Sequence, residues 1–388
     1  MRRFLAILTA LVSLMAPSAM AQEREIAVLD ALLSEAPAEA AQFAPAFLAA
    51  MPVEQLQPVL DGIKSAIGPV ETITHQSDMD YLVETASHTI QAQIGLDADG
   101  RITGIFFRPA IAKDRPVADV LGELSAIAPQ SAYLVTLNGE VVHAHNADQP
   151  LAVGSAFKLG ILAALNDSID GPDGWATAIP LRAEDISLPS GILQTWPVGA
   201  PVTLDTLANL MISMSDNTAT DALLHHVGRD AVEAKLGIAP VLSTRELFVL
   251  KSTPDLLERY QNGDTEERRA VLADVAERPL PSVSRILDPH VPGVEWDIPL
   301  TTLCPLIEQL RELRAFAINP GVASRADWSS IAFKGGSETG VLNFTTAVTD
   351  DAGNVYCVAA SWNAPQAIDE AAAGNAYAGL LAALARGN

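Results

Sequence analysis

The 388-residue sequence is poor in basic residues, in cysteine and in long apolar runs. It contains 24 Lys and Arg against 47 Asp and Glu, which gives a formal net charge of −23. Such a charge repels nucleic acid and anionic membrane surfaces, so we expect neither as a partner. The two cysteines, Cys304 and Cys357, allow at most one disulfide. Their separation in the sequence does not show how close they lie in space, so a disulfide and two buried free thiols remain equal alternatives.

The one long apolar run lies at the N-terminus. Arg2 and Arg3 precede an apolar stretch from Phe4 to Met15, and Ala19-Met20-Ala21 forms a small-x-small cleavage site. This order is typical of a secretory signal peptide, and the run is shorter than an ordinary membrane-spanning helix. A retained anchor is the alternative. We therefore expect residues 1–21 to be removed and the mature protein to be periplasmic or secreted, without membrane attachment.

The next part of the chain changes from a helical to a strand pattern. Residues 23–67 carry Ala, Leu and Glu at helical spacing, and residues 70–108 alternate with the period of strands. Helices followed by four antiparallel strands predict a small α+β domain over residues 22–110. It contains no catalytic cluster. Residues 109–116 are typical of a linker.

Residues 111–388 predict a second α+β domain, whose antiparallel sheet is interrupted by helices. A hairpin around Asn138-Gly139 begins the sheet, and a long helical segment follows to about Ala317. Three strands between residues 330 and 362 complete the sheet before a closing helix over residues 367–386.

The sequence Gly154-Ser155-Ala156-Phe157-Lys158 opens an apolar helix in this second domain. We expect Ser155 in the first helical turn, with Lys158 three residues on and on the same side. A lysine in a dry pocket loses its proton more easily, and the neutral amine can activate a serine hydroxyl. Backbone amides at the start of the helix can stabilise an oxyanion. A Ser-x-x-Lys sequence alone is common, however.

Two later segments make the pattern specific. Ser215-Asp216-Asn217 follows a predicted helix over residues 204–214, and Lys334-Gly335-Gly336-Ser337 ends a predicted strand over residues 330–334. These motifs, in this order after Ser-x-x-Lys, are those of penicillin-recognising serine enzymes. Residues 131–386 therefore resemble the class A β-lactamase domain of the penicillin-binding-protein superfamily, with Gly335 at the usual threonine.

The two-domain layout narrows the resemblance. A helix-plus-four-strand domain before such a domain resembles the β-lactamase-like serine hydrolases related to the esterase of clavulanic acid clusters. Residues 244–248 and Val294-Glu295-Trp296 are similar to that group as well.

The resemblance implies a role for each matching residue. Ser155 is the nucleophile, and Lys158 is its base, directly or through a relay. Ser215 passes the proton to the leaving group, and Lys334 supplies positive charge for a substrate carboxylate. The amides of Ser155 and Ser337 form the oxyanion hole. The substrate-binding residues are Asn217, Gly336 and Ser337.

One departure from the family concerns hydrolysis of the acyl-enzyme. Class A enzymes use a loop glutamate for this step, and the position at the matching distance from Ser215 is Lys251. Glu246 is nearby, but Leu250 replaces the asparagine that helps to hold the water. Glu246 is thus a candidate deacylation base. A helix-end charge paired with Arg245 is the favoured alternative.

We expect a serine hydrolase that forms an acyl-enzyme on Ser155 with a β-lactam or a related small ester or amide, with weak β-lactamase turnover. A carboxylesterase or a D-Ala-D-Ala-type peptidase is the alternative among enzymes. A sensor that acylates and stops is the alternative of another class. His143 and His145 share a strand face without an acidic or cysteine neighbour, so we expect no metal and no cofactor.

Overall fold

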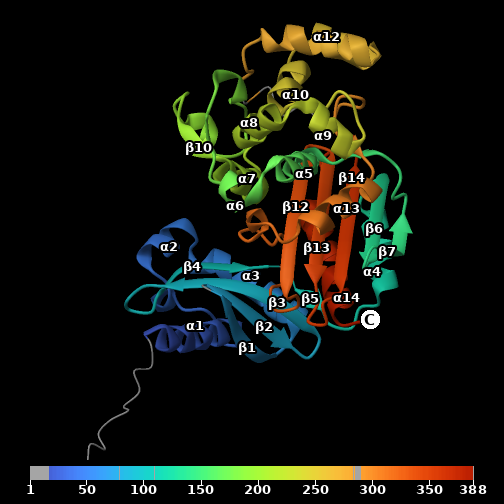
Figure 1. Ribbon diagram of the computed structural model, residues 1–388. Coiled ribbons are helices and arrows are strands. Elements are labelled where there is room, and N and C mark those ends of the chain that lie inside the picture. The colour runs from blue at the N-terminus through green and yellow to red at the C-terminus, as the bar shows by residue number, and fades with distance from the viewer. Residues whose placement is uncertain (1–16, 78, 109, 283, 285–289, 388) are drawn as a thin grey trace, which may run out of the picture. The chain divides into compact units, whose positions relative to one another are not determined.

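The computed structural model describes residues 17–387 except 78, 109, 283 and 285–289. The chain divides into two compact units, one ending at Asp114 and one spanning Arg115–Asn388 (Figure 1). Most of the predicted signal peptide, residues 1–16, lies outside the described residues. Every helix within the described ranges is too short or too polar to cross a membrane.

The first unit has the helices and the four strands that the sequence predicts. Its hydrophobic core lies between the helices and the sheet and contains Leu29, Leu60 and Tyr81. The strands pair antiparallel in chain order. The elements are α1 (Pro17–Leu33), the 3₁₀ turn η1 (Ala40–Gln42), α2 (Pro45–Ala50), α3 (Val53–Ile67), β1 (Val70–Ser77), β2 (Asp80–Thr85), β3 (His88–Leu96) and β4 (Ile102–Phe107).

The predicted linker contains one further strand, β5 (Ile111–Ala112). β4 pairs only with the second half of β3, so the backbone of His88 and Thr89 is available to β5. The first unit therefore continues beyond the expected boundary at residue 110 and ends at Asp114.

The second unit is built on a five-stranded antiparallel sheet in the order β12-β13-β14-β6-β7. The early hairpin and the three late strands join where β14 pairs with β6, from Tyr356↔Leu137 to Asn363↔Gln130. This is the interrupted sheet that the sequence predicts. The strands are β6 (Gln130–Leu137), β7 (Glu140–His145), β12 (Ser330–Glu338), β13 (Val341–Thr349) and β14 (Val355–Asn363).

Both faces of this sheet are covered by helices. Val358, Ala360 and Trp362 of β14 pack in a core with α4 (Val117–Ala126) and α14 (Glu370–Ala385). The alternate residues Cys357 and Ala359 belong to a second core on the opposite face, because successive strand residues point to opposite sides.

The second core lies in a helical lobe, which Figure 1 draws mostly in green and yellow, with α12 and α13 in orange. Its central helix is α5 (Lys158–Ser168), in which residues 158–165 are all buried, as expected for a helix surrounded by others. The other helices are α6 (Gly171–Gly174), α7 (Leu204–Ser213), α8 (Asn217–Val227), α9 (Arg229–Leu236), α10 (Thr244–Lys251), α11 (Pro254–Asn262), α12 (Thr265–Ala276) and α13 (Leu300–Leu310). Short strands β8 (Leu151–Ala152), β9 (Ala178–Pro180), β10 (Pro201–Thr203) and β11 (Asp297–Ile298) complete it.

A disulfide connects the sheet to this lobe. Cys304 on α13 and Cys357 on β14 are bonded, with their Cα atoms 5.7 Å apart. Both residues are almost fully buried. The structure thus selects the disulfide from the two alternatives that the sequence left open.

Candidate active site

Ser155 lies in a tight turn that precedes the central helix. The turn is a 3₁₀ helix, η2 (Gly154–Phe157), and α5 begins only at Lys158, so the predicted α-helical first turn is 3₁₀ instead. Trp296 holds this turn from one side. Its ring stacks on Phe157 with the ring centroids 3.9 Å apart, and its carbonyl accepts a hydrogen bond from Val153 N at 3.1 Å.

Strand β12 approaches the other side of the turn through Gly336. A Cβ atom at this position would lie 2.2 Å from Val153 O and 2.4 Å from Ser155 N, so no larger residue fits without displacement. The second glycine of Lys334-Gly335-Gly336 therefore allows the strand to contact the backbone of Ser155. It also brings Ser337 beside the turn, because a Cβ on Gly154 would lie 3.3 Å from Ser337 N.

Lys158 is fully buried beneath the turn, and its amino group is hydrogen-bonded to the Ser-Asp-Asn segment. Its Nζ lies 2.7 Å from Ser215 O, 3.0 Å from Ser215 Oγ and 2.7 Å from Asn217 Oδ1. Among the described residues, none of its hydrogen bonds goes to Ser155 Oγ. The sequence predicted that Ser155 and Lys158 share a helix side; the structure joins Lys158 to Ser215 instead.

Ser215 connects two lysines. Its Oγ lies 3.0 Å from Lys158 Nζ and 3.2 Å from Lys334 Nζ. Its backbone has a φ of 56°, in the left-handed region that a serine rarely adopts. Such backbone strain is found where a side chain has to be aimed at a functional site.

Both lysines are deprived of water. Burial, and then the positive charge of Lys334, hold the pKa of Lys158 well below its ordinary value. Burial lowers the pKa of Lys334 to about 7. A lysine that has lost its proton can accept one, so Lys158 can act as a base near neutral pH.

The loop before α7 is fixed on Asp216. Its carboxylate caps α8 by accepting from Ala219 N at 2.8 Å, and its other oxygen accepts from Ile192 N and Leu193 N at 2.7 and 2.9 Å. Ser190, on the same loop, donates to Ser215 O at 2.9 Å. Asp216 thus organises the backbone around Ser215, and its hydrogen bonds in the described structure go to backbone amides of Ile192, Leu193 and Ala219.

The side chain of Asn217 is engaged within the protein. Its Oδ1 accepts from Lys158 Nζ, and its Nδ2 donates to Leu188 O at 2.7 Å. Asn217 nevertheless lines a pocket beside Ser155.

With this geometry established, comparison with known proteins gives the family. Residues 116–253 match the sequence model described as Beta-lactamase enzyme family. The matched segment contains Ser155, Lys158 and Ser215-Asp216-Asn217. This segment is of the β-lactamase enzyme family. The second unit therefore contains a β-lactamase-type serine hydrolase segment, and the resemblance deduced from the motifs is confirmed.

Solved structures similar to the chain include β-lactamases and PBP-A. A β-lactamase from Sphaerobacter thermophilus is 23% identical, with a TM-score of 0.48 over 69% of this chain and 94% of that one. PBP-A is 17% identical, with a TM-score of 0.45 over 71% and 99%. An ancestral class A β-lactamase is 16% identical, with a TM-score of 0.47 over 70% and 100%. No curated protein sequence matches the chain.

Two pockets of the β-lactamase domain meet at Ser155. The first, of about 330 Å³, is called here the Lys334 pocket and also contains Ser215, Gly336 and Ser337. The second, of about 380 Å³, is called the Glu338 pocket and contains Asn217, Phe248 and Trp296. The sequence-predicted residues Ser155, Ser215, Asn217, Lys334, Gly336 and Ser337 thus line one continuous cleft, with Lys158 beneath it.

Glu246, the candidate deacylation base, lines neither pocket. Its carboxylate accepts from Ser243 N at 2.7 Å in a capping box at the start of α10. It also binds the guanidinium of Arg229 through both oxygens, at 3.0 and 2.7 Å. The predicted pairing with Arg245 is wrong, because Arg245 donates to backbone carbonyls instead.

Lys251, at the position of the family's loop glutamate, is buried in an acidic environment. Its Nζ lies 2.6 Å from Glu295 Oε1 and 2.9 Å from Glu338 Oε2. Sequence reasoning named neither glutamate as functional. The signal was present in the strand period, since Glu338 follows Lys334 by four residues and so shares its strand face.

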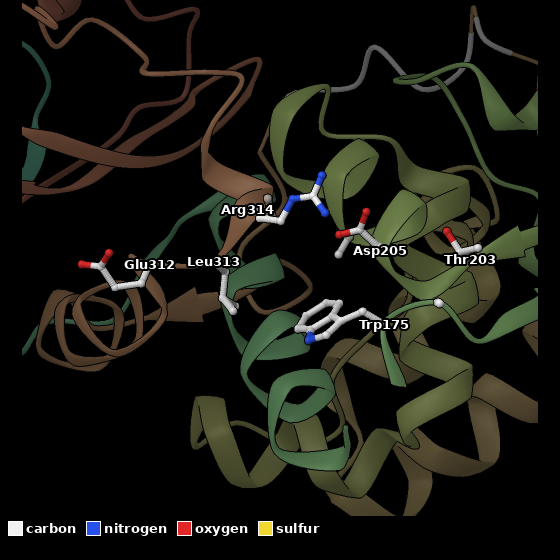
Figure 2. A pocket seen from close by; sticks show the side chains of 9 residues that line it. Trp175, Thr203, Asp205, Glu312, Leu313 and Arg314 are labelled. Atoms are coloured by element: carbon white, nitrogen blue, oxygen red, sulfur yellow. The ribbon is translucent and has the colours of Figure 1, made fainter. Parts of the chain in front are cut away.

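A separate pocket of about 440 Å³ in the same domain does not include Ser155. Figure 2 shows Arg314 and Asp205 pointing toward one another across it, beside Trp175, with Glu312 directed away. In the described ranges, no group of three or more His, Cys, Asp or Glu is placed to hold a metal ion.

Proposed function

We propose that this protein attacks a β-lactam, or a related small ester or amide, with Ser155 and forms an acyl-enzyme. The observation that carries the proposal is the hydrogen-bonded group of Lys158, Ser215 and Lys334 in the cleft that contains Ser155. β-Lactams are the small-molecule substrates that fit the family.

Acylation begins when Ser155 loses its proton as its Oγ attacks the carbonyl carbon. Neutral Lys158 is the base, and its hydrogen bond to Ser215 Oγ supports a relay through that hydroxyl. The amides of Ser155 and Ser337 stabilise the oxyanion. Ser215 then delivers a proton to the leaving nitrogen or oxygen. Lys334, in the same pocket, attracts a carboxylate on the substrate.

Hydrolysis of the acyl-enzyme is proposed to be slow. The family's loop glutamate is replaced by Lys251, and the carboxylate of Glu246 is occupied by Arg229 and Ser243. A positioned general base contributes about 10²–10⁴-fold in rate. Weak β-lactamase turnover with an accumulating acyl-enzyme is therefore expected. Gly335 has no hydroxyl that could hydrogen-bond to the carboxylate of a penicillin. Activated esters should therefore turn over faster than penicillins.

Covalent labelling of Ser155 tests the proposal. The full chain is exposed to benzylpenicillin and to a chromogenic cephalosporin, and the adduct is located by intact-mass and peptide analysis. Ser155→Ala should remove the adduct and nearly all turnover, on the order of 10⁶-fold as in comparable triads. Ser190→Ala, which alters another serine of the cleft, should still form the adduct. An adduct on Ser155→Ala would refute the assignment. A single stoichiometric burst without later turnover would identify a sensor instead.

We also propose export of the protein through a signal peptide over residues 1–21. The Cys304–Cys357 disulfide supports this, because such bonds persist in oxidising compartments. N-terminal sequencing of protein recovered from the periplasm and the medium tests it. A mature chain that begins after Ala21 is expected, and a chain retaining Met1 would contradict the proposal.

A further inference from the structure

We propose that Glu338 is the general base that activates water for hydrolysis of the acyl-enzyme on Ser155. Lys251 and Glu295 hold it in position. This inference rests on the acyl-enzyme function proposed above and concerns its second half.

The first observation is the direction of the side chains along β12. Lys334, Gly336 and Glu338 alternate with their neighbours, so all three belong to one strand face. Lys334 reaches Ser215 from this face, and Gly336 contacts the backbone of Ser155. Glu338 is the next residue on the same face, about 7 Å along the strand from Gly336. Its side chain is thus on the opposite side of Ser155 from Lys334.

The second observation is the pocket on that side. Glu338 and Ser155 line the same cavity of about 380 Å³, together with Asn217, Phe248 and Trp296. A water molecule between the Glu338 carboxylate and an acyl group on Ser155 fits within this volume. Glu246 is excluded from this position, because it lines neither pocket and its oxygens are bound elsewhere.

The third observation is the way the buried charges are compensated. The Lys251 and Glu295 side chains are each 1% exposed, and Glu338 is 20% exposed, so Glu338 is the member that faces the cleft. Glu295 Oε2 and Glu338 Oε1 are buried and receive no hydrogen bond from a donor group of the described residues. Burial, and then the neighbouring Glu295 carboxyl, favour the protonated form of Glu338. One lysine and two carboxyls that share one proton are together neutral, which suits a buried site.

The surroundings of Glu338 decide when it is charged. Burial, and then the charge of Glu295, raise the pKa of Glu338, and the opposing charge of Lys251 does not cancel this increase. Burial lowers the pKa of Lys251, but the charges of Glu295 and Glu338 together outweigh burial and raise this pKa, so the lysine stays protonated. Three other titratable groups face the cluster or its pocket, namely His290, Asp297 and Glu370.

The reaction step needs only water, the acyl-enzyme and side chains of the protein. The ionised Glu338 removes a proton from water while the water oxygen bonds to the acyl carbon. The bond from that carbon to Ser155 Oγ then breaks, and the proton that Glu338 took from water returns to Ser155 Oγ, so Glu338 is ionised again and Lys158 stays neutral. The products are the free acid and the serine hydroxyl. Because Glu338 is mostly protonated at neutral pH, hydrolysis is slow there and becomes faster as pH rises.

Separate measurement of acylation and deacylation tests the inference in the full chain. The burst rate with a chromogenic cephalosporin gives acylation, and the decay of the isolated penicillin adduct by intact mass gives deacylation. Glu338→Gln should acylate within about threefold of the unmodified protein but deacylate about 10²–10⁴-fold more slowly. The matched control is Glu370→Gln, another carboxylate of the same pocket, and it should change neither rate.

The pH dependence distinguishes a catalytic carboxyl from a structural one. Deacylation of the unmodified protein should rise with pH, and this rise should be absent in Glu338→Gln. Glu295→Gln removes the neighbouring negative charge, so the rise should move to lower pH. Glu338→Asp keeps a carboxylate and should retain measurable deacylation, which decides the matter if the glutamine variant does not fold.

Three results would overturn the inference. They are unchanged deacylation in Glu338→Gln, persistence of its pH rise, or the same loss in Glu370→Gln. Failure of the unmodified protein to become labelled on Ser155 would instead overturn the acyl-enzyme function on which the inference rests.

Discussion

The amino group of Lys334 lies 3.2 Å from the hydroxyl oxygen of Ser215. Lys334 is buried and lines the cleft, so its charge acts directly on the proton relay and on a bound anion. Because burial lowers the pKa of Lys334 to about 7, this charge is lost as pH rises through neutrality.

The charge of Lys334 predicts different pH profiles for anionic and neutral substrates. The ratio of kcat/KM for benzylpenicillin to that for its methyl ester should be constant well below pH 7. Above about pH 7 it should fall roughly tenfold per pH unit, because kcat/KM follows the ionisation of the free enzyme. Ionisation of Lys158 affects both substrates and cancels in the ratio. A ratio that stays flat from pH 6 to 9 would rule out this role, and Lys334→Ala should flatten it.

The contact between Gly336 and Ser155 predicts that even a methyl group at residue 336 slows acylation. A Cβ at residue 336 would lie 2.4 Å from Ser155 N, so Gly336→Ala should displace an oxyanion-hole amide. Loss of one such donor costs about 10²–10³-fold, which stopped-flow acylation can measure. Gly374→Ala on α14 is the control, since its nearest neighbour would be 4.0 Å away. Equal acylation rates in both variants would contradict the proposed geometry.

The contacts of Glu246 predict a structural role. Glu246→Gln should change the steady-state rate by less than about tenfold. It should lower the free energy of unfolding by about 1–3 kcal/mol, because the Arg229 guanidinium loses its charged partner. Urea denaturation and cephalosporin turnover measure the two quantities. A drop of about 10³-fold with trapped acyl-enzyme would instead identify Glu246 as the missing base.

The disulfide predicts a stability that depends on oxidation. Cys304 and Cys357 are 53 residues apart, so the bond restricts a long loop of the unfolded chain. Replacing both with alanine should lower the free energy of unfolding by about 2–4 kcal/mol. Neither cysteine lines the cleft, so turnover of the folded variant should be retained. The check is denaturation of the variant beside the unmodified protein with and without reductant, where a difference below about 1 kcal/mol would argue against the bond.

Most of the site could be predicted from the sequence because its residues belong to short motifs. Ser155, Ser215 and Lys334 each stand beside a local signal: a helix start, a helix end or a strand end. The hairpin could also be predicted from two adjacent residues, since Asn138 and Gly139 both adopt the positive φ that such a turn requires.

The contacts that could not be predicted join residues from separate elements. Arg229 on α9 reaches Glu246 on α10, which adjacent charges in the sequence do not indicate. Glu295 and Glu338 meet at Lys251 only after the sheet and the helical lobe have packed. The strand expected over residues 330–334 continues to Glu338, and this extension aligns Glu338 with Lys334.

The left-handed backbone of Ser215 means that selection for stability and selection for activity oppose each other at this residue. A non-glycine residue at a φ of 56° is held at a cost on the order of 1–3 kcal/mol, which glycine would avoid. Glycine, however, has no hydroxyl to place between Lys158 and Lys334. A laboratory evolution experiment that rewards only thermal resistance would therefore favour glycine at residue 215 and return a more robust protein that no longer turns over its substrate.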